Sequence, residues 1–209
     1  MSADEILLIS HIEESTTLLG PFQRFVIWVH GCCFDCKGCL AHNTKFGEYK
    51  RMTIEELGKL ILQQENIEGI TISGGEPFLQ ANALRKLIDY LRIKKDLGVI
   101  IYSGFTMEQL DQKPECKSLL EVTDILIDGP YIEDLDIGQP YIGSSNQVIH
   151  QLSGRYIKDA SYYKAKGRRA EIKIYSDQVV LVGVPSKEAL KTWNDLKEKA
   201  RGMQDDFGN

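Results

Sequence analysis

Short apolar runs rich in β-branched residues alternate along this sequence with segments of helical period. Each run ends close to a glycine or a small polar residue, where a loop begins. We expect strands over residues 24–29, 69–73, 99–102 and 124–127. Strands that are separated by helices pair in parallel through right-handed crossovers. The alternation therefore predicts an α/β fold with a mainly parallel sheet.

The segments between these strands carry helix signals of their own. Thr53 and Glu56 form a capping-box pattern, and apolar residues follow at helical spacing. Further helices are expected over residues 82–94, 106–110 and 114–121. These units are too few for a closed eight-fold barrel, so we expect a partial, open barrel. Polar and glycine residues gather just after the strands, at the edge where parallel α/β proteins bind ligands.

The pattern loosens over residues 131–170, which are rich in Gly, Ser, Asn and Tyr and show no sustained period. A loop of that length is unusual in a compact domain, so we interpret it as a functional surface or contact region. After it, the sequence predicts a hairpin of residues 171–175 and 178–182 and a final helix over residues 186–201.

The charge balance is acidic, with 25 Lys and Arg against 30 Asp and Glu. A nucleic-acid surface needs clustered positive charge, so we expect no nucleic-acid partner. The basic cluster of Lys164, Lys166, Arg168 and Arg169 is expected to be a solvated loop. Apolar runs such as residues 25–29 are too short to span a membrane. The N-terminal residues lack the basic segment of a signal peptide, so we expect a cytoplasmic protein.

Four of the five cysteines lie within eight positions. Such clustering is typical of metal binding or redox chemistry in a reducing compartment. The spacing is C-x3-C-x2-C when it starts at Cys32 and C-x2-C-x2-C when it starts at Cys33, and both end with Cys36 and Cys39. Either set of thiolates is able to hold an iron–sulfur cluster. A ferredoxin needs a fourth cysteine nearby, and the next one is Cys116.

Three thiolates leave one iron of a [4Fe–4S] cluster open to a cofactor or substrate, which favours a catalytic cluster. The competing hypothesis is a structural zinc site made by Cys33, Cys36, Cys39 and His42, whose spacing is also compatible with tetrahedral coordination. Buried thiols without a metal are a third alternative.

A second motif, Ser-Gly-Gly-Glu-Pro at residues 73–77, follows the next expected strand. Together with C-x3-C-x2-C, it resembles the radical S-adenosylmethionine superfamily. More narrowly, four stretches resemble the anaerobic ribonucleotide reductase activating enzymes: Gly-Cys at 38–39, Tyr-Ser-Gly-Phe at 102–105, Ile-Asp-Gly-Pro-Tyr at 127–131 and Gly-Ser-Ser-Asn-Gln at 143–147. The resemblance implies a partial (β/α)6 barrel with a C-terminal hairpin and helix. It also implies a single domain over residues 1–209, with its core at about 15–150 and an extension at about 151–209.

The resemblance selects the first spacing, so it implies that Cys32, Cys36 and Cys39 hold the [4Fe–4S] cluster. Cys33 is then an extra thiol, either a backup ligand or a residue that packs inside the protein, and we favour packing. Many members of the superfamily place an aromatic residue just before the third cysteine. The residue here is Gly38, so adenine contacts are expected from the backbone around Gly38 and Leu40.

The same resemblance implies a site for S-adenosylmethionine at the strand ends. Gly74 and Gly75 would let the backbone approach the methionyl ammonium group closely, and Glu76 would add a counter-charge. Ser103 and Asp128 are candidate contacts to the ribose or the carboxylate. Taken alone, each of these two is equally well explained as a helix cap or a turn residue.

The activity that the resemblance implies is reductive cleavage of S-adenosylmethionine to a 5′-deoxyadenosyl radical. The expected outcome is a glycyl radical on a protein partner such as anaerobic ribonucleotide reductase, with flavodoxin or ferredoxin as the electron donor. Radical modification of a peptide or a small molecule is an alternative within the same chemistry. A zinc-stabilised binding module without enzymatic activity is the alternative from another class.

Overall fold

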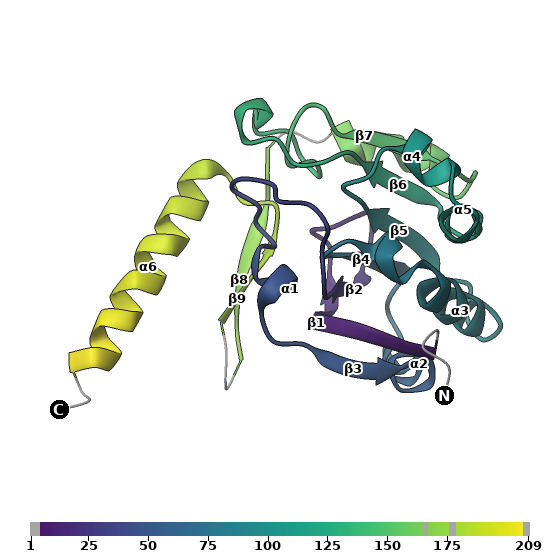
Figure 1. Cartoon of the computed structure of the whole chain (residues 1–209), viewed down its shortest axis with the longest axis horizontal. Coiled ribbons are helices and arrows are strands. Elements are labelled where there is room, and N and C mark those ends of the chain that lie inside the picture. The colour runs from purple at the N-terminus through teal and green to yellow at the C-terminus, as the bar shows by residue number, and fades with distance from the viewer. Residues whose placement is uncertain (1–4, 165–166, 176–178, 207–209) are drawn as a thin grey trace.

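The computed structural model describes residues 5–164, 167–175 and 179–206. Within them, seven strands form one sheet in the order β3-β1-β2-β4-β5-β6-β7, and β8 pairs with β9 in a separate hairpin (Figure 1). The strands are β1 Ile6–Thr16, β2 Arg24–Val29, β3 Lys50–Thr53, β4 Gly69–Gly74, β5 Gly98–Tyr102, β6 Ile125–Asp128, β7 Val148–Gln151, β8 Ala170–Ile174 and β9 Val179–Gly183. The helices are α1 Asn43–Phe46, α2 Ile54–Gln63, α3 Ala81–Arg92, α4 Met107–Asp111, α5 Pro114–Leu120 and α6 Lys187–Asp206, with short 3-10 turns η2 Pro77–Gln80, η3 Glu133–Leu135 and η4 Ile157–Lys164.

The predicted α/β class is confirmed, and the sheet is mixed. The four predicted strands are β2, β4, β5 and β6, which pair in parallel in this order. Three strands that the sequence did not predict extend the sheet with antiparallel pairing: β1 and β3 next to β2, and β7 next to β6. In the described residues the parallel part of the sheet therefore comprises four strands.

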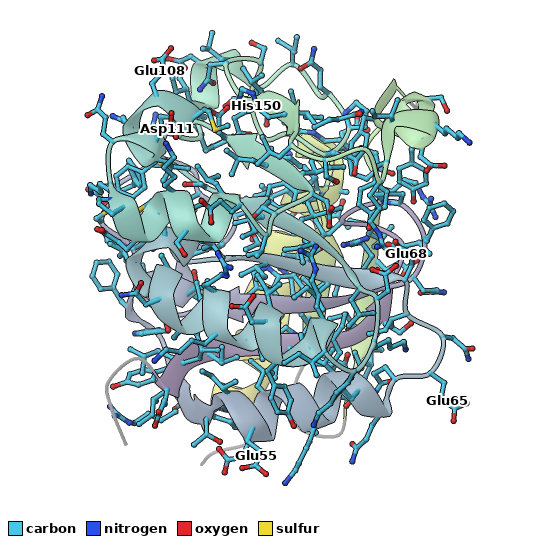
Figure 2. All side chains as sticks on the ribbon, turned by 90° about the vertical axis from the view of Figure 1, so that its right-hand side faces the viewer. Glu55, Glu65, Glu68, Glu108, Asp111 and His150 are labelled. Atoms are coloured by element: carbon cyan, nitrogen blue, oxygen red, sulfur yellow. The ribbon has the colours of Figure 1, made fainter. Side chains whose placement is uncertain are left out.

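One face of the sheet is covered by α2, α3 and α5, and their contact with it is the main apolar core. Figure 2 looks onto this helical layer, with the labelled Glu55 of α2 at the bottom of the view and Glu108 of the neighbouring α4 at the top. The predicted capping box is present, because Thr53 Oγ1 accepts from the backbone of Glu56, whose carboxylate accepts from the backbone N–H of Thr53. None of the helices that the structure describes combines the length and the apolar character needed to cross a bilayer.

Arg24 closes the amino-terminal end of the parallel strands. Its side chain is fully buried, and it donates to Thr71 Oγ1 at 2.7 Å and to the carbonyl oxygen of Gly98 at 2.9 Å. It also bonds Glu68 and the hydroxyl of Tyr156, both at 2.8 Å. Tyr156, which directly precedes η4, is buried at this end of the sheet. The opposite, carboxyl edge therefore remains for ligands.

The C-terminal segments confirm the predicted hairpin and helix, although residues 176–178 at the hairpin turn lie outside the described residues. Lys173 and Tyr175 anchor the hairpin to β1, because both bond the buried carboxylate of Glu13, at 2.6 and 2.7 Å. Figure 1 shows α6 projecting at the side of the molecule, away from α2, α3 and α5.

The prediction that the basic cluster is a solvated loop is wrong for Arg168. Its side chain is only 3% exposed, because it forms an ion pair with Asp136 and bonds several backbone carbonyls. Arg169 is exposed as expected, the side chain of Lys164 is not described, and Lys166 lies outside the described residues. Sequence spacing alone could not separate these neighbours, because the partners of Arg168 lie about thirty residues away.

Candidate active site

The predicted site residues share one edge of the sheet. The cysteine loop, residues 30–42, follows β2, and Gly74 and Gly75 lie at the end of β4. Ser103 follows β5, and Asp128 ends β6. Because these four strands are parallel neighbours, all four groups meet at their carboxyl ends.

The glycine pair fastens the end of β4 to the start of the cysteine loop. The N–H of Gly75 donates to the carbonyl of Val29, and the N–H of Glu76 donates to the carbonyl of Gly31, both at 2.8 Å. A Cβ atom on Gly75 would lie 2.0 Å from the Gly31 oxygen, and one on Gly74, whose φ is 102°, would lie 2.7 Å from backbone atoms of β2. Only glycine permits this approach. Gly74 and Gly75 are expected from the sequence to allow a close approach of the backbone. In the structure, the backbone that they approach is that of the cysteine loop and the strand before it.

Several contacts hold the cysteine loop in place, and the main one is to the residues that follow β5. Phe34 lies within the loop, and its ring packs edge-on to Phe105 with centroids 4.8 Å apart. Gly104 leaves room for this ring, because a Cβ there would be 2.6 Å from Phe34. At the base of the loop, the N–H of Gly31 donates to the carbonyl of Thr44 at 2.9 Å. Phe34 is a positioning residue that the sequence did not reveal, since only the fold brings residue 105 next to it.

The three predicted ligands Cys32, Cys36 and Cys39 are half-buried on this loop. The prediction that Cys33 packs inside the protein is wrong, because Cys33 is exposed. Cys116, by contrast, is buried in the helical core.

Burial raises the pKa of the Cys32 and Cys39 thiols, and the charges of neighbouring thiols raise it further. Cys39 acts in this way on Cys32, and Cys36 acts on Cys39, so Cys39 lies within electrostatic reach of both other thiols. In the described residues, no three His, Cys, Asp or Glu side chains converge into a ready-made metal site. The donor set nevertheless fits an iron–sulfur cluster, because three free, half-buried cysteines on one loop supply the thiolate ligands that such clusters use.

Glu76 ties the end of β4 to the end of β5. Its carboxylate is 1% exposed and accepts from the N–H of Phe78 at 3.0 Å, the hydroxyl of Ser103 at 2.9 Å and the N–H of Gly104 at 2.8 Å. Burial raises the pKa of Glu76 to about 7, although these three donors act in the opposite direction. The carboxyl group is therefore engaged within the protein and holds the strand ends together.

Ser103 and Asp128 are also buried and have partners within the chain. Besides its bond to Glu76, Ser103 accepts from the N–H of Phe105 at 3.0 Å. Asp128 accepts from the N–H of Met107 at 2.5 Å, and its second oxygen lies 3.1 Å from Nε2 of His150. His150, labelled in Figure 2, is a neighbour that the sequence did not predict, because β7 joins β6 from outside the alternating pattern.

Gly38 and Leu40 lie on the outer side of the cysteine loop. Leu40 is 45% exposed, and Gly38 has a φ of 74°, which favours glycine. A Cβ on Gly38 would lie 3.1 Å from the carboxylate of Glu133 and 3.5 Å from the ring of Tyr131. The loop after β6 therefore flanks the cysteine loop directly at Gly38.

Comparison with known proteins places this chain in a family. Residues 18–150 match the family described as a 4Fe-4S single cluster domain. The chain is 35% identical over 143 residues to the "Anaerobic ribonucleoside-triphosphate reductase-activating protein" of Vibrio cholerae, which covers 64% of this chain and 91% of the relative. The chain belongs to this family of activating proteins. The proteins of the same name from Escherichia coli and Enterobacteria phage T4 are 30% and 29% identical over 144 and 137 residues, covering 64% and 62% of this chain and 91% and 85% of the relatives.

Membership confirms the resemblance inferred from the sequence motifs. The chain is an activating enzyme of the radical S-adenosylmethionine type, and Cys32, Cys36 and Cys39 all lie inside the matched 4Fe-4S domain. The match ends at residue 150. In this activating enzyme, η4, β8, β9 and α6 therefore lie outside the matched part of the family.

Proposed function

We propose that this enzyme cleaves S-adenosylmethionine reductively at a [4Fe–4S] cluster held by Cys32, Cys36 and Cys39. The resulting 5′-deoxyadenosyl radical would take a hydrogen atom from a glycine of a protein partner such as anaerobic ribonucleotide reductase. The observation that carries this proposal is the cysteine loop fastened to residues 74–76 at the carboxyl edge of a parallel sheet, in a chain of the activating-protein family. The relatives are named for the same partner.

The cluster and S-adenosylmethionine supply the electron transfer and the carbon radical when they are bound. The chain itself contributes thiolates, orientation and exclusion of water. Three ligands leave one iron without a protein ligand, and Cys33 is not needed as a fourth. Phe34 and the two backbone bonds to Gly75 and Glu76 hold the loop in place, so that the three thiols stay at the strand ends.

The cofactor site proposed at these strand ends uses backbone more than side chains. Gly74 and Gly75 place bare main chain beside the cysteine loop, where carbonyl oxygens are able to accept from an ammonium group. Glu76, Ser103 and Asp128 contribute by fixing the loops that they bond, and Glu76 also supplies negative charge when it is ionised. Adenine contacts are assigned to the backbone around Gly38 and Leu40.

The proposed architecture is a single domain in which the mixed sheet forms a partial barrel open at its carboxyl edge. Its core is placed at about residues 15–150, with residues 151–209 as an extension. The buried group around Arg24 blocks the opposite end, so the cofactor and the partner would both approach the carboxyl edge. Flavodoxin or ferredoxin is the proposed reductant, and the cytoplasm is the proposed location.

Anaerobic reconstitution tests the proposal. The protein is loaded with iron and sulfide, reduced and mixed with S-adenosylmethionine, and iron and 5′-deoxyadenosine are quantified. We expect about four irons for each chain, deoxyadenosine formation that is lost in Cys32→Ala, and retention of both in the matched variant Cys33→Ala. Adding anaerobic ribonucleotide reductase should then produce a glycyl radical signal in electron paramagnetic resonance.

Each negative result has a distinct meaning. A colourless protein that binds one zinc ion through Cys33 and forms no deoxyadenosine would contradict the central proposal. Deoxyadenosine without a glycyl radical on the reductase would retain the radical chemistry and refute the proposed partner.

A further inference from the structure

Arg168 connects the C-terminal extension to the loop after β6. The arginine comes from outside the family-matched residues, whereas its partners on the loop after β6 lie inside them. Its guanidinium group forms a two-point ion pair with Asp136, at 2.6 and 3.0 Å. It also donates to the carbonyls of Ile142 and Gly143, at 3.1 and 2.8 Å. Both charged side chains are nearly excluded from water, with exposed fractions of 3% and 6%.

The loop that Arg168 grips, residues 129–147, is also bonded to itself. Gln147 accepts from the N–H of Gly143 at 2.7 Å and donates to the carbonyl of Gly129 at 2.8 Å. Asn146 donates to the carbonyl of Pro130 at 2.8 Å. The Gly-Ser-Ser-Asn-Gln segment therefore closes the loop into a single unit, and Arg168 holds that unit from the side of the extension.

The same loop lies directly against the cysteine loop. The ring of Tyr131 lies between Gly143 and Gly38. A Cβ on Gly143 would be 2.7 Å from this ring, and a Cβ on Gly38 would be 3.5 Å from it. The hydroxyl of Tyr131 donates to Asp136 at 3.3 Å, which is the carboxylate that Arg168 holds. A second link, between Lys37 and Glu133 at 3.0 Å, is exposed to solvent and contributes little.

A series of bonded or neighbouring groups thus runs from the extension to the proposed cluster site. It passes from Arg168 to Asp136, then to Tyr131 and finally to Gly38, next to the ligand Cys39. The first and last steps of the path join segments that are distant in sequence, and the middle step lies within the loop after β6. The side chain that begins the path belongs to no motif of the matched domain.

We propose that Arg168 is a positioning residue, through which the C-terminal extension holds the loop of residues 129–147 and Tyr131 against the cysteine loop. The inference rests on the proposed function and deepens it, because this contact sets the wall of the mouth where a partner's glycine must enter. Loss of the contact should spare the cluster, whose ligands are anchored from the β4 and β5 side. It should impair the transfer of the radical to the partner.

Arg168→Gln removes the planar fork and the charge, and Arg168→Lys keeps the charge but not the two-point geometry. The neighbouring, exposed Arg169→Gln is the matched control, since it removes the same charge from the same segment. Three quantities are measured on the reconstituted enzymes: deoxyadenosine formation without partner, glycyl radical formed for each deoxyadenosine with anaerobic ribonucleotide reductase, and amide hydrogen exchange.

For Arg168→Gln we expect deoxyadenosine formation within about twofold of wild type. The glycyl radical yield should fall by at least about tenfold, since misplacement of about 1 Å is able to cost ~100-fold in a positioned reaction. Amides of residues 138–145 should exchange faster, while those of β4 and β5 stay protected. Arg168→Lys should lie between the two, and Arg169→Gln should match wild type.

Unchanged exchange in residues 138–145 would refute the contact as a determinant of loop position. Faster exchange with a normal glycyl radical yield would refute its role at the mouth, as would equal losses in cleavage and in radical transfer. If wild type forms no deoxyadenosine at all, the proposed function fails, and the exchange experiment still decides whether Arg168 positions the loop.

Discussion

Replacing Glu76 with Gln tests how the buried carboxyl group couples the site to pH. Glu76 is almost completely buried, and its pKa is raised from 4.5 to about 7 mainly by burial. Gln has nearly the same shape and resembles the protonated carboxyl group, but it does not ionise. The difference between the two proteins therefore isolates the free energy of ionising this one group.

The sign follows from the direction of the shift. Because the pKa of Glu76 is higher in the folded chain than in the unfolded chain, the folded state favours the protonated form. This contribution to the free energy of unfolding is complete below about pH 4.5 and is lost as the pH rises through about 7. Its size is about 3 kcal/mol, since each unit of pKa corresponds to ~1.4 kcal/mol. As the pH rises from 4.5 to 8, the free energy of unfolding of Glu76→Gln should therefore increase by about 3 kcal/mol relative to that of wild type.

The assay is urea unfolding of the iron-free, reduced proteins between pH 4.5 and 8, after circular dichroism has shown that both are folded. A gain of this size corresponds to roughly 6–12 °C in melting temperature for a chain of about 200 residues. Ser103→Ala is the control, because it keeps the carboxyl group and removes a donor that lowers the pKa of Glu76. Its pH dependence should be at least as large as that of wild type. A difference between Glu76→Gln and wild type that does not change with pH would refute the reasoning.

Three further predictions follow from the packing of the site and its support. Arg24→Met should lower the free energy of unfolding by about 3–5 kcal/mol in urea titrations, because it leaves the buried Thr71 hydroxyl and the carbonyl oxygens of Ile70 and Gly98 without their donor, and a loss below about 1 kcal/mol would contradict this. Gly75→Ala should reduce cofactor cleavage by up to ~100-fold through displacement of the cysteine loop, whereas Gly154→Ala, which has open space around it, should behave as wild type. Phe34→Ala should release iron to a chelator several times faster than wild type, since the loop loses its contact with Phe105, and an unchanged release rate would count against that contact as an anchor.

The parts of the fold that local sequence determines were predicted well. Strands β2, β4, β5 and β6 and the helices between them follow from apolar periodicity, caps and glycines, all of which act over a few residues. The family resemblance likewise came from short motifs, and the comparisons confirm it. β1 was missed because it contains polar residues such as Glu13, whose burial makes sense only with Lys173 and Tyr175 beside it.

For the site, the sequence by itself predicted which residues carry the chemistry, and the structure places them after neighbouring parallel strands. That information is local, because thiol spacing and strand-end glycines are set by neighbours along the chain. Only the tertiary structure decided that Cys33 is exposed, that Glu76 is engaged with the next strand, and that Arg168 is buried against Asp136. Burial and hydrogen-bond partners depend on segments that are distant in sequence, and no pattern within a single segment specifies which distant carbonyl or carboxylate will meet it.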